Sequence, residues 1–324
     1  MPNILINKNK IGSFNKTINV SGDKSLSIRW VLLASLASGI SKSSNLLESE
    51  DVLAAIDAVK KLGIKVKLEN QTYKIIGKGL DGYNYKKNIS INAKNSGTLA
   101  RLIAGFLINS PHKIKITGDA SLSKRDFKRI AEPLKKFGAS FKLKKNKRLP
   151  MFITGSKKLK PINYFEKKGS AQCKSSVIFA ALRTEGKTLI KAKKSRNHTE
   201  LLCKHLNLPV KVISKKNYDL IEIRKAKKIR SFNYKIPSDI SSSAFFMVLT
   251  SLTKNSKLTI KNVNINSSRI GVITILKKMG VKIHFKKKQI YKGEKNADIQ
   301  IKSPENLNSI NCPIKLNSEA IDEF

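Results

Sequence analysis

The sequence has few of the features that would place it in several common classes of protein. Only three cysteines occur among 324 residues, at positions 173, 203 and 312, and this wide spacing suits neither a disulfide framework nor a metal cluster. The longest apolar run, around residues 30–37, is far shorter than the ~20 residues that a membrane-spanning helix needs. The first ten residues have neither the apolar core of a signal peptide nor the Arg-rich pattern of a transit peptide. We therefore expect a cytoplasmic protein that crosses no membrane.

Acidic residues are also scarce, with 22 Asp and Glu against 65 Lys and Arg, which gives a formal net charge of +43. Such an excess raises nucleic acid as a partner, because lysines neutralise phosphates. The lysines, however, are spread along the whole chain, and aromatic residues for base stacking make up only 6%. Ile and Asn are abundant too, so drift towards A/T-rich codons explains most of the charge. Steering of an anionic small substrate and binding of nucleic acid are the alternatives.

Arginine is rare against this lysine background. A retained arginine is therefore expected to mark a place where a planar, bidentate guanidinium is needed. The ten arginines are Arg29, Arg101, Arg125, Arg129, Arg148, Arg183, Arg196, Arg224, Arg230 and Arg269.

A repeat of about seventy residues runs through the chain. Four segments, starting at residues 51, 130, 198 and 272, each predict an amphipathic helix, a turn and a strand. Their turn residues are 75, 69 and 73 positions apart and suit a left-handed helix C-cap. These residues are Gly63, Gly138, Asn207 and Gly280.

A second helix precedes each of these segments, over residues 23–37, 95–108, 170–182 and 241–252. Their serine markers, Ser25, Ser96, Ser170 and Ser242, are 71, 74 and 72 positions apart. Ser is a common N-cap, but small residues at every start also leave backbone N–H groups open to an anion. With strands predicted at 112–118, 187–192 and 256–263, the repeated unit is β-α-β-α-β-β, and the fold class is α/β (α+β).

Eight stretches in this order resemble the 5-enolpyruvylshikimate-3-phosphate synthase family (3-phosphoshikimate 1-carboxyvinyltransferase). They are SGDKSLSIRW from Ser21, NSGTLARL from Asn95, GDASLSKR from Gly118, GSAQCKS from Gly169, SRNHTE from Ser195, PSDISSSAFF from Pro237, NSSRIGVITILKKMG from Asn266 and AIDEF from Ala320. The resemblance covers essentially the whole chain. It implies an inverse α/β barrel fold of six such units in two domains.

The resemblance also implies an activity in the shikimate pathway, which supplies chorismate and the aromatic amino acids. The family transfers the enolpyruvyl group of phosphoenolpyruvate to the 5-hydroxyl of shikimate 3-phosphate. By resemblance Lys24 is catalytic and touches both substrates, while Ser25 and Arg29 hold the shikimate part. Asp322 resembles the catalytic aspartate that handles the proton of the 5-hydroxyl.

Five further residues resemble substrate-binding residues of the family. Gly97 and Arg125 correspond to the phosphoenolpyruvate side, and Ser170, Gln172 and Arg196 to the shikimate phosphate and the space between the substrates. Two neighbouring positions differ from the common pattern of the family. Ala171 stands where some members have a second serine, and Asn197 stands where the usual residue is aspartate.

On the same resemblance, residues 21–239 should form a complete three-unit domain, and residues 1–20 and 240–324 an incomplete second domain of about one unit and the start of the next. We expect such a chain to be weak or inactive as a synthase, with a second chain as one source of the missing third. The full-length family is expected to be monomeric. No cofactor is implied, since the sequence carries neither a dinucleotide fingerprint nor a P-loop. His198 and His205 are predicted to lie on a helix surface and not to bind metal.

The sequence is also compatible with two other functions. The related UDP-N-acetylglucosamine enolpyruvyl transferase usually carries a reactive cysteine where this chain has GDASLSKR, and Lys24, Ser25 and Arg29 fit shikimate phosphate better. The other is a basic nucleic-acid-binding or non-catalytic interaction fragment on the same scaffold.

Overall fold

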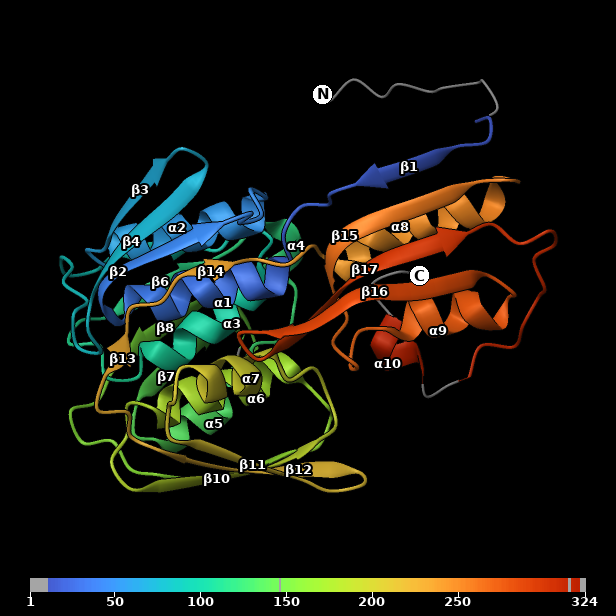
Figure 1. The fold of residues 1–324 in the computed structure, drawn as a ribbon. Coiled ribbons are helices and arrows are strands. Elements are labelled where there is room, and N and C mark those ends of the chain that lie inside the picture. Colours follow the sequence, from blue (N-terminus) through green and yellow to red (C-terminus); the bar gives the residue numbers. More distant parts are fainter. Residues whose placement is uncertain (1–10, 146, 314–315, 321–324) are drawn as a thin grey trace. The chain divides into compact units, whose positions relative to one another are not determined.

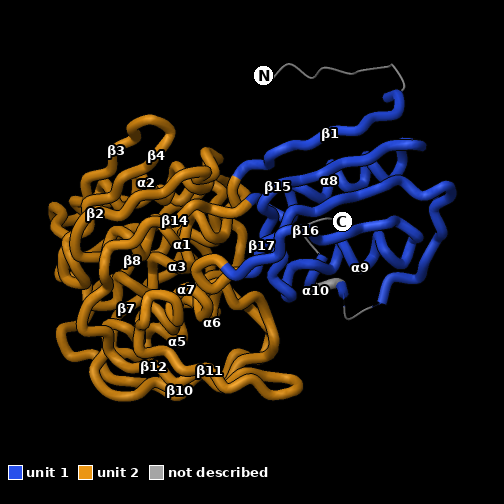
Figure 2. The backbone as a smooth tube through the Cα atoms, viewed as in Figure 1, with its two compact units in different colours: residues 1–21, 238–290, 295–324 blue, residues 22–237, 291–294 orange. Residues whose placement is uncertain are grey.

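The computed structural model describes residues 11–145, 147–313 and 316–320 (Figure 1). The chain divides into two compact units (Figure 2). The larger unit comprises residues 22–237 and 291–294, and the smaller one residues 1–21, 238–290 and 295–324. No helix among the described residues is long and apolar enough to cross a bilayer.

The larger unit contains three sheets with the same strand order. The first holds β13 (Ile229–Arg230), β2 (Ala37–Ser44), β4 (Thr72–Lys78) and β3 (Lys65–Glu69), with β14 (Tyr234–Lys235) also paired to β2. The second holds β5 (Ser90–Asn92), β6 (Ile114–Thr117), β8 (Arg148–Thr154) and β7 (Ser140–Lys144). The third holds β9 (Asn163–Glu166), β10 (Lys187–Lys193), β12 (Tyr218–Arg224) and β11 (Val210–Ser214).

Each of these sheets combines parallel with antiparallel pairs. In the second sheet β5 is parallel to β6, while β8 is antiparallel to both β6 and β7. The third sheet repeats this pattern, and in the first sheet β13 and β14 take the place of the leading strand. A parallel pair needs a crossover, which α3 (Gly97–Phe106) supplies between β5 and β6 and α6 (Ala171–Ala181) between β9 and β10. The predicted mixed α/β fold is confirmed.

The helices form two sets. The first set contains α1 (Lys24–Ser35), α3 (Gly97–Phe106) and α6 (Ala171–Ala181). The second set contains α2 (Glu50–Lys61), α5 (Lys128–Lys136) and α7 (His198–His205), and a short helix, α4 (Ala120–Ser123), precedes α5. The first set is buried on almost every side, as the buried Trp30 of α1 illustrates, and the rings of Phe106 and Phe179 stack with centroids 4.3 Å apart. A helix that is buried nearly all round belongs to a core, so α1, α3 and α6 form the centre of this unit.

The starts of the first-set helices differ in part from the prediction. Ser96 and Ser170 are N-caps whose hydroxyls accept from the backbone N–H three residues on. Asp23 caps α1 in the same way, so Ser25 lies inside the first turn and is not the cap. Ser and Asp cap helices about equally well, so the pattern of residue types alone does not choose between them.

The four predicted helix ends are confirmed. Gly63, Gly138, Asn207 and Gly280 have φ angles of 85°, 111°, 53° and 95°. This left-handed region favours Gly and tolerates Asn, which is why those residue types mark the ends of α2, α5, α7 and α9 (Gly271–Lys278).

The smaller unit holds a fourth sheet, with the order β1 (Asn15–Ile18), β15 (Lys257–Asn264), β17 (Glu294–Lys302) and β16 (Lys282–Tyr291). It also holds α8 (Ile240–Leu252), α9 and the short α10 (Asn317–Ala320). Ile240 and Met247 of α8 are buried in its core. Other positions of α8 carry exposed apolar side chains, at Phe245, Phe246, Val248, Leu249 and Leu252.

Candidate functional site

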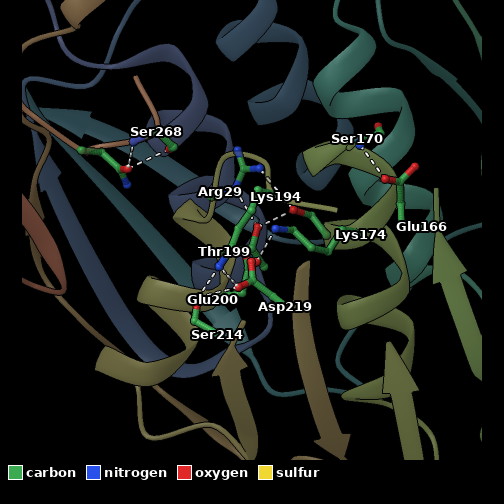
Figure 3. Close-up of polar contacts among 12 residues, drawn as sticks. Arg29, Glu166, Ser170, Lys174, Lys194, Thr199, Glu200, Ser214, Asp219 and Ser268 are labelled. Carbon is green, nitrogen blue, oxygen red and sulfur yellow. Dashed lines mark hydrogen bonds and ion pairs between the residues drawn. The ribbon is translucent and has the colours of Figure 1, made fainter. Parts of the chain in front are cut away.

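Arg29 is a deeply buried residue of the predicted site. Its side chain extends from α1 and is held by hydroxyls of α6 and α7 (Figure 3). Nε donates to Oγ1 of Thr199 at 2.8 Å, and Nη2 donates to Oγ of Ser175 at 3.3 Å. Nη1 donates to the carbonyl oxygen of Ser25 at 2.9 Å, and the two hydroxyls of Ser175 and Thr199 are 2.7 Å apart.

All of these acceptors are neutral, although the residue is only 3% exposed. Burial lowers the pKa of Arg29 to about 10, against the opposing attraction of Glu200, Asp23 and Glu294. A lowered pKa means that the buried cation is poorly compensated, and an anionic ligand would supply what is missing.

A second group of residues surrounds the start of α3. A side chain at Gly97 would meet the guanidinium nitrogens of Arg101 and Arg125 at 3.1 and 3.2 Å, so the absence of a Cβ lets both arginines approach this turn. Nη2 of Arg125 donates to Oδ1 of Asn95 at 2.8 Å, which is again a neutral acceptor. Arg125 itself is exposed, and can therefore move towards a ligand.

Arg101 joins this group to α6. Its Nη1 donates to Oε1 of Gln172, and its guanidinium lies 5.2 Å from the centre of the Phe127 ring. Burial lowers the pKa of Arg101, and the nearby Arg125 and Arg129 lower it further, partly offset by Cys173. Positive charge is thus concentrated at the start of α3.

Gln172 and Ser170 lie in and before the first turn of α6. Nε2 of Gln172 donates to the hydroxyl of Thr98 at 2.9 Å, which ties α6 to α3. Ser170 caps α6, and its own backbone N–H donates to Glu166 at 2.7 Å. Glu166 also faces Nη2 of Arg129 at 3.6 Å, so this arginine, unlike Arg101, is paired with a carboxylate.

Lys24 begins α1 and is half-exposed, with its Nζ 3.3 Å from Oδ2 of Asp51. Arg196 precedes α7 and lies close enough to Arg29 to lower the pKa of that residue. The structure therefore brings Ser25, Arg29, Gly97, Arg125, Ser170, Gln172 and Arg196 to the starts of α1, α3, α6 and α7. Asp322, the predicted catalytic aspartate, lies outside the described residues.

Several residues of this region were not predicted from the motifs. Arg101 was marked only by the scarcity of arginine. The recognised stretch GSAQCKS contains Lys174 and Ser175, and the stretch SRNHTE contains Thr199 and Glu200. The sequence alone assigned no role to these four residues, all of which are buried in the structure. The burial of these side chains is what indicates a role, and it could not be predicted from the sequence.

The prediction for His198 was wrong. Its side chain is 1% exposed, and its Nδ1 lies 2.7 Å from Oε1 of Glu294. His205, near the end of the same helix, is partly exposed. Among the described residues, no group of three or more His, Cys, Asp or Glu could hold a metal ion.

A cavity of about 880 Å³ in the larger unit lies elsewhere. Its lining includes Ser38, Asn109 and Arg183, which follow the C-terminal ends of α1, α3 and α6. Arg183 is paired there with Asp81 at 2.7 Å, and the cavity lies at the opposite ends of the central helices from the arginine cluster.

Known proteins resemble this chain over nearly its whole length. The family model for EPSP synthase (3-phosphoshikimate 1-carboxyvinyltransferase) matches residues 8–318. The 3-phosphoshikimate 1-carboxyvinyltransferases of Caldicellulosiruptor bescii and Ruthia magnifica are each 40% identical, over 96% of this chain and 71% and 70% of their own lengths. The solved EPSP synthase from Acinetobacter baumannii is 36% identical with a TM-score of 0.86, covering 96% of this chain and 70% of that one.

The chain thus spans about 70% of the length of these relatives. The family model covers the clustered arginines and seven of the eight recognised stretches, since AIDEF begins at Ala320. From the family model and these relatives together, the chain belongs to the EPSP synthase (3-phosphoshikimate 1-carboxyvinyltransferase) family of shikimate-pathway transferases.

Proposed function

We propose that the larger unit binds shikimate 3-phosphate and provides one side of a site in which the enolpyruvyl group of phosphoenolpyruvate is transferred to the 5-hydroxyl of that substrate. One observation carries the proposal. Arg29, Arg101 and Arg125 are gathered at the starts of the central helices, and the hydrogen bonds described for each go to neutral acceptors. Both substrates are small polyanions, which such guanidinium groups and helix N-termini suit.

The shikimate part is assigned to α1 and α6. Arg29 binds the carboxylate of shikimate 3-phosphate, with Ser25 beside it on the first turn of the same helix. The phosphate is bound by Ser170, Gln172 and Arg196. Support comes from the fixed orientation of the Arg29 guanidinium, which three protein acceptors hold in place before any ligand arrives.

The phosphoenolpyruvate part is assigned to α3 and the turn before α5. Gly97 allows this substrate to approach the helix start, and Arg125 binds its charged groups. Lys24 lies between the two substrates, where an ammonium stabilises negative charge as the 5-hydroxyl oxygen adds to the enolpyruvyl carbon and phosphate then leaves. Asp322 takes the proton of the 5-hydroxyl as general base.

Full substrate conversion is proposed to depend also on polypeptide that corresponds to the part of the relatives that these 324 residues do not cover. The chain spans about 70% of its relatives, and the apolar face of α8 is exposed. We propose that residues 21–239 form a complete three-unit domain and residues 1–20 and 240–324 an incomplete one. These 324 residues by themselves should therefore bind shikimate 3-phosphate but turn over little, because excluding water and clamping phosphoenolpyruvate are proposed to need a second, complete domain. The scarcity of cysteine, three among 324 residues, suits a reducing cytoplasm.

The test combines ligand-induced stabilisation with a steady-state assay. At physiological salt, shikimate 3-phosphate should raise the melting temperature of the chain, and duplex DNA or RNA should not. Stabilisation by nucleic acid alone would favour a nucleic-acid-binding module, and stabilisation by neither ligand would favour an interaction fragment. Turnover equal to that of a full-length relative would overturn the proposed dependence on further polypeptide.

A further inference from the structure

Two buried charges flank the hydroxyls that hold Arg29. Lys174 directly precedes Ser175 in α6, and Glu200 directly follows Thr199 in α7. Nζ of Lys174 lies 2.6 Å from Oε1 of Glu200 (Figure 3). The ion pair is therefore next to the polar contacts of Arg29 and joins the same two helices.

The two charges depend on each other. The side chain of Lys174 is 0% exposed and that of Glu200 is 5% exposed. Their contact is a short ion pair without the angles of a well-aligned hydrogen bond, and no other hydrogen-bond partner is found for either charged group among the described residues. Removing one member would leave the other as an uncompensated buried charge.

Stability alone does not explain this pair. Buried ion pairs often contribute no more stability than apolar side chains of similar volume would. Lys174 also lies in the first turn of α6, where the helix dipole disfavours a cation, whereas Glu200 in the first turn of α7 is well placed for an anion. A neutral residue at 174 would suit the helix better, so the lysine calls for another explanation.

The surroundings of Arg29 offer one. Glu200 contributes the strongest of the neighbouring charge interactions on Arg29, yet the guanidinium binds only hydroxyls and a carbonyl oxygen in the described contacts. A free Glu200 carboxylate one residue from Thr199 would be drawn to this guanidinium, because an Arg–carboxylate pair is stronger than a bond to a neutral acceptor.

We propose that Lys174 is a positioning residue that engages Glu200 and so keeps this carboxylate from neutralising Arg29. The inference rests on the proposed function, in which Arg29 binds the carboxylate of shikimate 3-phosphate. By holding Glu200, Lys174 leaves the charge of Arg29 available to the substrate, while Thr199 and Ser175 fix its direction. Lys174 itself touches no substrate in this scheme.

The experiment measures binding to the whole 324-residue chain by calorimetry. Two ligands are compared: shikimate 3-phosphate, and the analogue in which a carboxamide replaces the carboxylate. Lys174→Met should weaken binding of the acid by roughly tenfold or more, the equivalent of one lost charge-assisted interaction. Binding of the carboxamide should change little, because a neutral group gains nothing from a free Arg29 charge.

The double variant Lys174→Met/Glu200→Gln should recover binding of the acid to within about threefold of the parent, since Gln supplies no charge to compete. The matched control is Lys225→Met, which removes the lysine of an exposed ion pair with Glu185, 2.6 Å long, in the same unit. This control should bind both ligands as the parent does.

Each outcome decides between the explanations. Failure of the parent chain to bind shikimate 3-phosphate would overturn both the proposed function and this inference. Normal binding by folded Lys174→Met, or equal weakening of both ligands, would overturn the inference alone and leave the proposed function standing. If melting curves show that Lys174→Met does not fold, Lys174→Gln removes the charge but keeps a polar group, one atom shorter than lysine. It should then weaken binding of the acid selectively, and equal effects on the two ligands would count against the inference.

Discussion

The side-chain amide of Gln172 donates a hydrogen bond of 2.9 Å to the hydroxyl of Thr98. The amide oxygen of the same residue accepts a hydrogen bond from Arg101, so one side chain of α6 contacts two residues of α3. The acceptor that holds Arg101 is therefore a neutral amide, at a position where a carboxylate would also fit. The geometry keeps the positive charge of α3 uncompensated at the point where the central helices begin.

Replacing Gln172 by Glu should therefore change stability and binding in opposite directions. A carboxylate facing Arg101 forms a charge-assisted pair, so the melting temperature should stay the same or rise. The same carboxylate competes with an anionic substrate, and binding of shikimate 3-phosphate should weaken by roughly tenfold, the value of one charged interaction. Gln71→Glu, which makes the same change in an exposed turn, is the control. Parallel loss of stability and binding would contradict this account.

Arg29 should not tolerate replacement by lysine. An ammonium cannot reach the acceptors of Thr199, Ser175 and Ser25 at once, because it lacks the planar fork of the guanidinium. We expect Arg29→Lys to bind shikimate 3-phosphate at least roughly tenfold more weakly in a calorimetric titration, with one or more charge-assisted hydrogen bonds lost. Arg224→Lys, an exposed arginine 3.2 Å from Glu222, should bind as the parent does. If Arg29→Lys bound shikimate 3-phosphate with unchanged affinity, the assignment of Arg29 to the binding site would be wrong.

Local rules of backbone geometry made much of the fold predictable from sequence. The helix ends at Gly63 and Asn207 follow from the left-handed φ that such residues accept, and this depends on no distant contact. Helix starts were harder, because Asp23 and Ser25 are both good capping residues and only the path of the chain decides between them.

Burial along a helix was the information missing from the sequence. His198 and His205 are seven residues apart and share a helix face, but they are also about 10 Å apart along the axis. The first turn of α7 lies against Arg29 of α1, whereas its last turn is nearer the surface. For the same reason the burial of Lys174 and Glu200 could not be predicted, because a single Lys or Glu on a helix is usually exposed. Their role becomes visible only when α6 and α7 are placed together.

The three thiols should differ in reactivity. Burial raises the pKa of Cys203, and it raises that of Cys173 as well, so both are protonated in the native chain at pH 8. The half-buried Cys312 should react first with a disulfide reagent, and Cys203 only when the chain unfolds. Each pKa lies above its unfolded value, so the stability that these two neutral thiols give is present at low pH and is lost as the pH rises towards the folded value.

A thiol titration at pH 8, with and without denaturant, tests this order. Cys312→Ser should remove the fast phase and leave the slow one. Cys173 lies beside Gln172 in the first turn of α6, so shikimate 3-phosphate should slow its modification further. Reaction of Cys203 as fast as that of Cys312 in native buffer would show that the core around α7 is open.

The exposed face of α8 should make the 324-residue chain bind apolar dyes and self-associate. Phe245 is 77% exposed and Leu252 67%, with Phe246, Val248 and Leu249 beside them, and a contiguous apolar patch of this kind favours association. The double variant Phe245→Ser/Leu252→Ser should lower the fluorescence of anilinonaphthalene sulfonate and shift the chain towards monomer in sedimentation experiments. Its melting temperature should change little, because neither side chain is buried. Ile290→Ser is the control, since Ile290 is 74% exposed but belongs to β16. Equal effects of the control and the double variant would mean that general hydrophobicity, and not the α8 face, drives association.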